Sequence, residues 1–384
     1  MSAKILFVLH AASRNGASIV LLNFLKWLRT NSDFTFYVLF LKGGALESEF
    51  RELATVEIFN VNSKQNNLAQ RLLNKLNRKY KGGTSSQLSF LKEKKIDLVY
   101  LNTVATTQVL GYVYSLGCPI ISHIHELGWA IERHSGKEGF EKIKNYTTQY
   151  IAVSQVVKDN LITHHSIPEN KIDIIYESIP KISDDFSLTK DKIFQHLNIP
   201  NNSFMICASG FTNWRKGVDL FPQLAKLVEQ RWELEEPVHF VWVGGQTSEK
   251  LTDVWFDIKK LGLAKKVHLI GEQPNPLEYF ASSDIFTLLS REDPFPLVCL
   301  EAASLGKPIL CFNDSGGMPE FVEQDAGFVV PYLDLVGMAE KIITLAQDKR
   351  LRNQLGNRAQ EKVLTRHEIS TSAPQILEVI SRYL

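Results

Sequence analysis

The chain alternates short, continuous apolar runs with longer amphipathic segments. In its first half such runs lie at 4–10, 34–42, 96–102, 119–125 and 150–154. Apolar runs that do not alternate with polar residues are typical of parallel strands covered by helices on both faces. Because a strand, a helix and a second parallel strand form the βαβ unit, this half is predicted to be a doubly wound α/β domain.

A polar, proline-containing stretch at 179–193 interrupts the alternation, which then restarts. Five further apolar runs follow it, at 203–210, 239–245, 266–271, 284–290 and 308–313. A chain of 384 residues is too long for one comfortable core, so we predict two α/β domains of similar size, the first at 1–183. Ligands of open α/β sheets bind beyond the carboxyl ends of the strands, which makes the cleft between the domains the expected site.

The bulk properties exclude several classes of protein. With 44% hydrophobic and 22% charged residues the chain is globular, and a net charge of +1 predicts no nucleic-acid binding. The four cysteines form no CxxC pair and are expected to be reduced core thiols of a cytoplasmic protein. The first apolar run is too short for a signal peptide, and no run approaches the ~20 apolar residues of a membrane span. No GxGxxG follows a strand, which disfavours a dinucleotide-dependent dehydrogenase.

Three acids lie in the loop and helix that follow the fourth of the later runs. The loop would deliver Asp293 to the cleft beyond the carboxyl end of the strand, and a helix from about Leu297, ended by Gly306, would present free backbone N–H groups there. A carboxylate suits a sugar, since it accepts charge-assisted hydrogen bonds from neighbouring hydroxyls. Alternatively, Glu292 and Asp293 only complement the helix dipole, but that interpretation leaves Glu301 unexplained.

Two neighbouring cations, Arg215 and Lys216, lie between a strand that ends at Gly210 and a helix expected to begin near Gly217. Cations in such a loop can meet a pyrophosphate and stabilise the charge that develops on a departing phosphate. A solvated basic turn is the alternative interpretation.

Three further segments carry weaker signals. Asn15 and Gly16 open the first helix, where they either hold a phosphate or form a tight turn. The stretch 313–322 contains a Gly-Gly pair that permits close backbone approach, but also ordinary helix-start residues. His123 and His125 would share one face of a strand, and without a third ligand nearby a substrate hydrogen bond from His125 is favoured over zinc. The chain has no DxD, which argues against a carboxylate-held Mg²⁺ or Mn²⁺.

A basic segment at 64–81 carries six Lys and Arg residues, no acid, and four leucines at helical spacing. This pattern predicts an amphipathic helix whose basic face, around Arg71 and Lys81, contacts either an anionic surface or only solvent. The first alternative would bring the protein to the inner face of the membrane or to a lipid-linked acceptor.

In this order, the motifs resemble those of the family 4 glycosyltransferases, whose GT-B architecture has two Rossmann-like domains facing a central cleft. The resemblance covers most of the chain and is strongest from about Ile206 to Val330. The family's E-x7-E signature, usually EGFGLVxLEA, corresponds here to DPFPLVCLEA, which aligns Asp293 and Glu301 with its two acids. The resemblance implies an acceptor-binding first domain, a nucleotide-sugar-binding domain at 184–365, and a C-terminal helix at 366–384 that crosses back to the first.

The resemblance implies a role for each matching residue. Glu301 would hold the ribose hydroxyls, Asp293 would contact the transferred sugar, and Lys216 with Arg215 would stabilise the diphosphate. His125 matches the histidine that approaches the donor sugar. The further nucleotide- or sugar-binding positions that it implies are Asn15, Gly16, Gly210, Gly271, Phe295, Pro296, Leu297 and Val298.

Three positions depart from the family pattern. Asp293 is one methylene shorter than the usual glutamate. Pro296 stands in place of a glycine and has no N–H to donate. Phe211 stands where the family has an arginine. We expect the first two departures to bear on the choice of sugar, and at the third Arg215 either replaces the missing arginine in space or does not.

The resemblance predicts a retaining, metal-independent enzyme without a cofactor. It would move a hexose from a nucleotide diphosphate sugar, most commonly a UDP-sugar such as UDP-glucose, to a glycan or lipid-linked saccharide in polysaccharide biosynthesis. No protein nucleophile is expected, because the leaving phosphate is thought to accept the proton of the acceptor. A sugar-nucleotide epimerase of the same fold and a non-catalytic sugar-nucleotide sensor are the alternatives.

Overall fold

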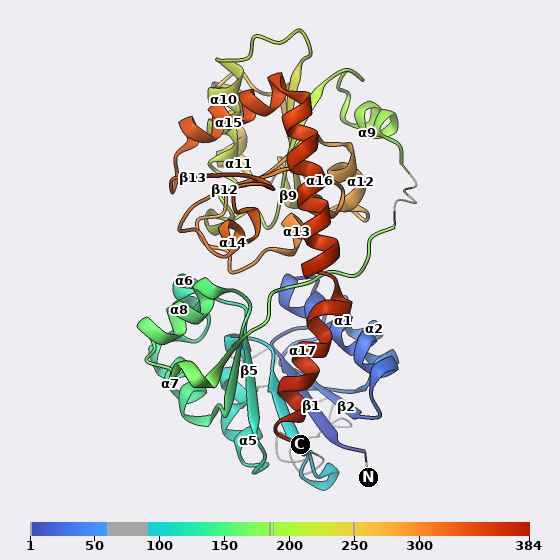
Figure 1. Ribbon diagram of the computed structural model, residues 1–384, viewed down its shortest axis with the longest axis vertical. Coiled ribbons are helices and arrows are strands. Elements are labelled where there is room, and N and C mark those ends of the chain that lie inside the picture. The colour runs from blue at the N-terminus through green and yellow to red at the C-terminus, as the bar shows by residue number, and fades with distance from the viewer. Residues whose placement is uncertain (1, 60–90, 184–185, 187, 249) are drawn as a thin grey trace, which may run out of the picture. The chain divides into compact units, whose positions relative to one another are not determined.

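The computed structural model describes residues 2–59, 91–183, 186, 188–248 and 250–384. These residues pack into two compact α/β units (Figure 1). One unit contains the described residues up to Val153 together with 160–175 and 373–384, and the other contains 154–159 and 176–372. The basic helix predicted at 64–81 lies outside the described residues.

The first unit is built on a parallel sheet of seven strands in the order β3-β2-β1-β4-β5-β6-β7. The winding changes direction between β1 and β4, which is where open sheets of this kind bind ligands. Its strands are β1 Lys4–Leu9, β2 Thr35–Phe40, β3 Thr55–Ile58, β4 Leu98–Leu101, β5 Ile120–Ile124, β6 Gln149–Ala152 and β7 Ile172–Ile174. Its helical segments are α1 Gly16–Asn31, α2 Glu47–Leu53, η1 Val104–Val109, α5 Leu110–Tyr114, α6 Gly128–His134, α7 Gly136–Tyr146 and η2 Glu169–Lys171, and α8 Gln155–Thr163 contains residues of both units.

The second unit repeats this plan with six parallel strands in the order β10-β9-β8-β11-β12-β13. Here the winding changes direction between β8 and β11. The strands are β8 Phe204–Ser209, β9 Val238–Thr247, β10 Val267–Gly271, β11 Ile285–Leu288, β12 Ile309–Phe312 and β13 Gly327–Val330. The helical segments are α9 Lys190–Leu197, η3 Trp214–Lys216, α10 Phe221–Glu229, α11 Thr252–Lys260, α12 Pro276–Ser282, α13 Leu297–Ser304, α14 Met318–Val322, α15 Leu335–Gln347 and α16 Lys349–Arg366, and α17 Ile369–Ser381 again contains residues of both units.

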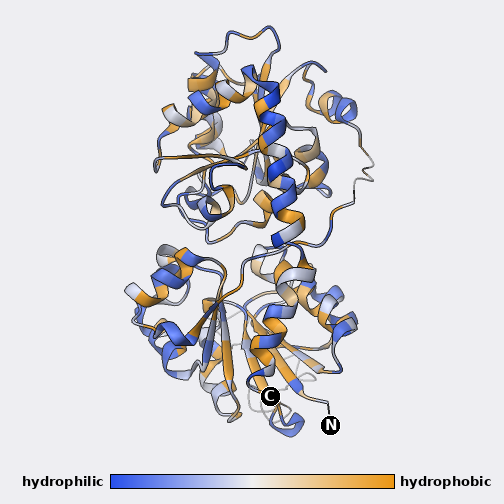
Figure 2. Cartoon of the chain, viewed as in Figure 1, coloured by the Kyte–Doolittle hydropathy of each residue, from blue (hydrophilic) through white to orange (hydrophobic). Residues whose placement is uncertain are grey.

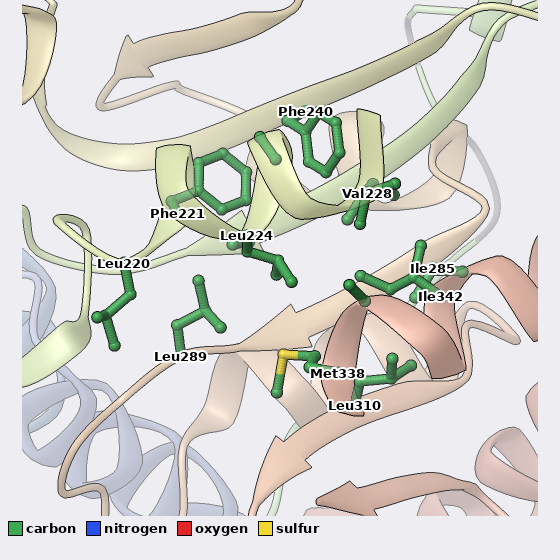
Figure 3. Packing of buried hydrophobic residues seen from close by; sticks show 14 of the residues in the cluster. Leu220, Phe221, Leu224, Val228, Phe240, Ile285, Leu289, Leu310, Met338 and Ile342 are labelled. Carbon is green, nitrogen blue, oxygen red and sulfur yellow. The ribbon is translucent and has the colours of Figure 1, made fainter. Parts of the chain in front are cut away.

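The core of the second unit lies where α10 and α15 pack beside the sheet (Figure 3). Helix α10 turns Phe221, Leu224 and Val228 to one side, at the spacing of an apolar helix face. They belong to one buried cluster with Phe240 of β9 and Met338 of α15. This packing fixes the strand ends from which the loops of the candidate site emerge.

The predicted doubly wound fold is confirmed, because the strands of both sheets are parallel and their order is that of Rossmann-like domains. Figure 2 shows the apolar strands between helices of mixed hydropathy, which is the pattern inferred from the sequence. The sequence analysis missed β3, β7 and β13, three short strands at sheet edges, where less apolar surface has to be covered. It also placed the helix after Lys216 too early: Gly217 is left-handed and ends a 3₁₀ turn, and α10 begins only at Phe221.

The four cysteines are free thiols, and three of them are buried while Cys118 is half-buried. Within the described part of the chain, none of the helices combines the length and apolar character needed to cross a membrane.

Candidate functional site

The loops that follow β8 and β11 carry the charged residues of the candidate site. The two strands are neighbours in the sheet of the second unit, so the loops beyond their carboxyl ends lie side by side. The backbone N–H of Arg291 donates to the carbonyl of Arg215 at 2.7 Å, which ties one loop to the other. The position where the winding reverses therefore gathers the residues that the sequence had placed in two separate motifs.

Lys216, Arg215 and Asp293 form one cluster in which Asp293 is buried and the two cations are partly buried. The ammonium of Lys216 is paired with Oδ2 of Asp293, and Nη1 of Arg215 lies 3.7 Å from Oδ1. Ser290 donates its hydroxyl to Oδ2 of Asp293 at 3.0 Å, and Arg215 donates to the carbonyl of Glu292 at 2.6 Å. The cluster contains two cations and one anion, so it keeps one net positive charge beyond the carboxyl ends of β8 and β11.

The pKa of Asp293 shows which effect dominates in this cluster. Burial of the carboxyl is the largest single influence, and it raises the pKa. The charges of Lys216 and Arg215, together with the hydrogen bonds from Lys216 and Ser290, lower the pKa by more than burial raises it. The net result is a pKa below the ordinary value. Asp293 is therefore an anion at neutral pH despite being only 6% exposed.

Two glycines set the path of the loop that holds Lys216. Gly217 has φ 76°, and a Cβ there would clash with the carbonyl of Leu289, so the 3₁₀ turn can pack against the β11 loop only with glycine. Gly210 has φ 148°, and the side chain of Lys216 lies over it, its Cδ 3.3 Å from where a Cβ would be. Asn213 caps the turn by accepting the N–H of Lys216 at 3.0 Å.

Glu301 lies in α13 as the sequence predicted, and its environment differs from that of Asp293. The side chain is half-buried, and among the described residues no hydrogen bond or ion pair engages its carboxylate. Burial raises the pKa of Glu301 to about 7. A carboxylate in this state would gain charge-assisted hydrogen bonds from vicinal hydroxyls, which is the chemistry of a ribose.

The segment from Phe295 to Val298 forms the start of α13. Pro296 is the N-cap residue and supplies no side-chain cap, and the first N–H groups of a helix, here those of Leu297 and Val298, lack intrahelical acceptors. These amides can meet an anion. The ring of Phe295 is not available for a ligand, since it is 5% exposed and stacks on His367 at 5.3 Å. Only its backbone can contribute to a site.

The Gly-Gly pair of the 313–322 segment approaches protein backbone. A Cβ on Gly316 would clash with the carbonyl of Asp293, and the N–H of Gly317 donates to the carbonyl of Pro294 at 2.9 Å. The pair therefore braces the loop that carries Asp293.

Farther along the same segment, the carboxylate of Glu320 accepts the backbone N–H groups of Gln155 and Val156, each at 2.9 Å. Glu320 therefore caps the first turn of α8.

Gly271 ends β10 at the edge of the sheet, two strands away from β8. Its φ of 71° and the Cγ2 of Thr247, 2.9 Å from where a Cβ would be, both require glycine.

In the ranges that the structure describes, no group of three or more His, Cys, Asp and Glu side chains is placed to hold a metal.

The first unit contains the remaining predicted residues. Asn15 caps α1 by accepting the N–H of Ser18 at 3.0 Å, and Gly16 begins the helix with no atom within 4 Å of where a Cβ would be. Gly16 thus leaves open space at a helix start, which fits close approach of a ligand but does not require glycine for folding.

His125 follows β5 and lies next to His123, with ring centroids 4.1 Å apart. Nδ1 of His123 is hydrogen-bonded to the hydroxyl of Tyr100 at 2.7 Å, and burial holds the pKa of His123 well below its ordinary value. His123 is therefore a neutral core residue, whereas His125 lies at the strand end. Nε2 of His125 is 3.2 Å from Oδ1 of Asn102.

The sequence analysis missed three residues that hold these side chains, namely Ser290, Asn102 and Glu126. Asn102 ends an apolar run and is fully buried, and Glu126 is 7% exposed and follows His125 directly. A polar residue at the carboxyl end of a predicted strand is the signal that could have identified Asn102 and Glu126. Ser290 has no comparable signal, because serine is common in loops.

The comparisons with known proteins agree with this arrangement. A family model described as glycosyl transferases group 1 matches residues 189–362, and one described as glycosyltransferase family 4 matches residues 14–180. The first of these ranges contains the Lys216–Asp293 cluster and Glu301, and the second contains Asn15 and His125. The chain belongs to the family 4 glycosyltransferases.

Individual relatives of this family 4 chain are more distant. It is 27% identical over 227 residues to the capsular polysaccharide biosynthesis glycosyltransferase CapM of Staphylococcus aureus, covering 58% of this chain and 59% of CapM. It is 24% identical over 306 residues to the UDP-Gal:alpha-D-GlcNAc-diphosphoundecaprenol alpha-1,3-galactosyltransferase of Escherichia coli, covering 77% of each. The chain spans 28%, 59% and 52% of the lengths of three curated relatives.

A solved structure establishes the GT-B fold for this family 4 chain. Anabaena HepE, in complex with UDP-glucose, superposes with a TM-score of 0.79 at 22% identity, covering 99% of both chains. At this identity the likeness supports the fold and not the substrate.

Proposed function

We propose that the protein is a retaining glycosyltransferase that moves a hexose from a UDP-sugar, with UDP-glucose as the first candidate, to a glycan or lipid-linked saccharide. The observation that carries the proposal is that two carboxyl groups in different environments lie on one loop and on the helix that follows it. Asp293 is ionised and held by cations, whereas the carboxylate of Glu301 has no hydrogen-bond or ion-pair partner among the described residues. An enzyme that binds a nucleotide sugar needs both a cationic place for the diphosphate and a free acceptor for ribose hydroxyls.

We propose a role for each of these residues, and the contacts described above support it. Lys216 and Arg215 would meet the diphosphate and stabilise the charge that grows on it as the bond to the sugar breaks. The free amides at the start of α13 would add to this field. Glu301 would accept the ribose hydroxyls. These cations and amides take the place that a divalent metal has in other transferases, so we propose a metal-independent reaction.

The transfer would replace the bond between the anomeric carbon and the phosphate oxygen by a bond to the acceptor oxygen on the same face of the sugar. The departing diphosphate would accept the proton that the acceptor hydroxyl loses. Asp293 would contact hydroxyls of the transferred sugar, and His125 would approach the donor sugar. Because Asp293 is already paired with Lys216, it would also set the position of the lysine that meets the diphosphate.

The relatives support the choice of substrates. CapM is named for capsular polysaccharide biosynthesis, the E. coli relative for a UDP-galactose donor and a diphosphoundecaprenol acceptor, and HepE was solved with UDP-glucose. By analogy we propose a nucleotide-sugar donor and a polysaccharide or lipid-linked acceptor, used in the cytoplasm or at the inner face of the membrane.

The experiment that tests the proposal has two stages. Thermal-shift measurements against a panel of UDP-, GDP- and ADP-sugars should give a rise in melting temperature for one donor, because a ligand that binds only the folded state stabilises it. The preferred donor, with its sugar radiolabelled, is then incubated with lipid-linked and soluble saccharide acceptors, and transfer is followed by chromatography.

The outcomes separate the competing functions. Transfer of label with an α-linked product from an α-linked donor supports a retaining transferase. Isomerised sugar from the donor alone would instead identify an epimerase, and specific binding without transfer or hydrolysis would identify a sensor. If the protein binds none of the nucleotide sugars, all three functions are refuted.

A further inference from the structure

Arg291 lies in the loop after β11, and its side chain reaches the loop after β8. Its Nη1 donates to the carbonyl of Trp214 at 2.6 Å and to Oδ1 of Asp219 at 2.9 Å, and its Nη2 donates to Oδ2 of Asp219 at 2.7 Å. The guanidinium also lies over the ring of Trp214, 4.8 Å from the ring centroid. With only 10% of its side chain exposed, Arg291 is nearly enclosed by the second unit.

These contacts hold the 3₁₀ turn η3, which carries the two cations of the candidate site. Trp214 begins the turn, and Asp219 lies just beyond the left-handed glycine that ends it, so one guanidinium is bonded on both sides of the turn. The backbone N–H of Arg291 also donates to the carbonyl of Arg215. A 3₁₀ turn this short has few hydrogen bonds of its own, so its position depends on the residues that anchor it.

Arg291 differs in its environment from the cations that it anchors. Its charge is compensated by the carboxylate of Asp219, and both N–H groups of Nη1 have acceptors within the protein. A planar guanidinium can donate to two carboxylate oxygens and a carbonyl at once, which a lysine ammonium on a flexible stem does not reproduce. Arg291 is therefore suited to hold a neighbouring segment in place rather than to contact a ligand.

We propose that Arg291 is a positioning residue, which places Lys216 and Arg215 for the diphosphate by holding both sides of the 3₁₀ turn with one guanidinium. The inference rests on the proposed function for the diphosphate, but the anchored turn is a property of the free protein. Because the two cations act on charge that grows as the bond to the sugar breaks, their displacement lowers kcat more than it raises the KM for the donor.

The first test measures the turn itself, by hydrogen-exchange mass spectrometry of the full chain without ligand. Arg291→Lys keeps the charge and removes the paired donors, so amides in 211–217 should exchange about tenfold faster. The control is Arg358→Ala, which removes an arginine of the same unit that donates to Asp325 at 2.8 Å and to Glu361 at 2.7 Å. It should leave exchange in 211–217 unchanged. An unchanged rate in Arg291→Lys, or an equal increase in Arg358→Ala, would overturn the proposal.

The second test is the transfer reaction. In Arg291→Lys, kcat per folded molecule should fall about tenfold or more, with a smaller change in the KM for the donor. A merely structural role would lower the melting temperature and leave kcat per folded molecule unchanged. Direct action of the arginine's charge on the diphosphate would be retained by lysine. Transfer at the wild-type rate in Arg291→Lys therefore contradicts the positioning role.

A third variant changes the other side of the contact. Asp219→Asn keeps the shape of the side chain and weakens the bond to Arg291, so kcat should fall as it does in Arg291→Lys. The double variant should be no slower than the slower single one, because both substitutions break the same contact. If Arg291 met the diphosphate directly, Asp219→Asn would free its charge and tighten UDP binding in calorimetry. Tighter UDP binding, or additive losses in the double variant, would refute the proposal.

The two proposals fail independently. Faster exchange of 211–217 in Arg291→Lys, in a protein that binds no nucleotide sugar, would refute the proposed function and leave the anchoring of the turn standing. Transfer by the wild-type protein, with kcat unchanged in both Arg291→Lys and Asp219→Asn, would refute only the role of Arg291.

Discussion

Lys216 and Asp293 form an ion pair between the loops that follow β8 and β11, with 11% and 7% of their side chains exposed. Burying two charges is costly unless each compensates the other. The pair therefore makes the position of the lysine depend on the loop that also carries the start of α13. In the proposed function, this contact would link diphosphate binding by Lys216 to sugar binding by Asp293.

Loss of the lysine should affect both stability and activity. In Lys216→Ala, Asp293 stays buried with only the more distant Arg215, so we expect a loss of about 2–4 kcal/mol in the free energy of unfolding. Transfer should fall by a factor of roughly 10² or more, because one cation at the departing phosphate is missing. Urea denaturation and initial rates measure the two effects.

A matched control separates the site from an ordinary ion pair. Lys226 pairs with Glu229 in α10 at 2.8 Å with about a third of its side chain exposed. Lys226→Ala should cost less than ~1 kcal/mol and leave transfer unchanged. Equal effects of the two substitutions would show that Lys216 has no special role.

The affinity for UDP-glucose should depend on the ionisation of Glu301. Ribose hydroxyls stabilise the carboxylate form, and the pKa of Glu301 in the free protein is raised to about 7. Affinity should therefore rise with pH, being roughly tenfold weaker at pH 6 than at pH 8. Calorimetry over this range tests the expectation, with Glu301→Gln as the control that should bind weakly and without this pH dependence. A wild-type affinity that is flat with pH would contradict the ribose assignment.

The same carboxyl should make stability depend on pH. Its folded pKa lies above the unfolded value, so its contribution to stability is fully present below the unfolded pKa of about 4.5 and is lost as pH rises through about 7. Glu301→Gln removes the cost of burying the ionised form. The variant should unfold several degrees higher at pH 8, corresponding to roughly 3 kcal/mol, with a gain of less than ~1 kcal/mol at pH 5. A gain of the same size at both pH values would exclude this cause.

Two glycines should respond differently to replacement by alanine. Gly217→Ala places a Cβ against the carbonyl of Leu289 at a left-handed φ and should destabilise the second unit by more than about 1 kcal/mol. Gly16→Ala meets no atom within 4 Å and should change stability by less than ~0.5 kcal/mol. If donor affinity falls in Gly16→Ala although stability is kept, Gly16 approaches the ligand. Thermal unfolding and calorimetry distinguish these results.

Chelation tests the proposed metal independence. Lys216 and Arg215 supply positive charge beyond the carboxyl ends of β8 and β11. EDTA should therefore leave the transfer rate within about twofold of its value in untreated enzyme. Loss of activity that Mg²⁺ or Mn²⁺ restores would show instead that a metal completes the site.

The sequence determined the fold class and most of the strands. Apolar runs without alternation predicted the central parallel strands, since a strand covered on both faces has no polar side to display. The edge strands β3, β7 and β13 escaped because they are short and only partly covered. The start of α10 was misplaced because the left-handed conformation of Gly217 depends on contact with Leu289, which is distant in the sequence.

The motifs also indicated which residues to examine, but only the tertiary structure decided how they are paired. The sequence presented Arg215 and Lys216 in one segment and Asp293 in another, and the adjacency of β8 and β11 brought them together. The different states of Asp293 and Glu301 likewise depend on which cations each one reaches and on burial. Local patterns report the periodicity of a chain, whereas the charge state of a carboxyl is set by neighbours that only folding supplies.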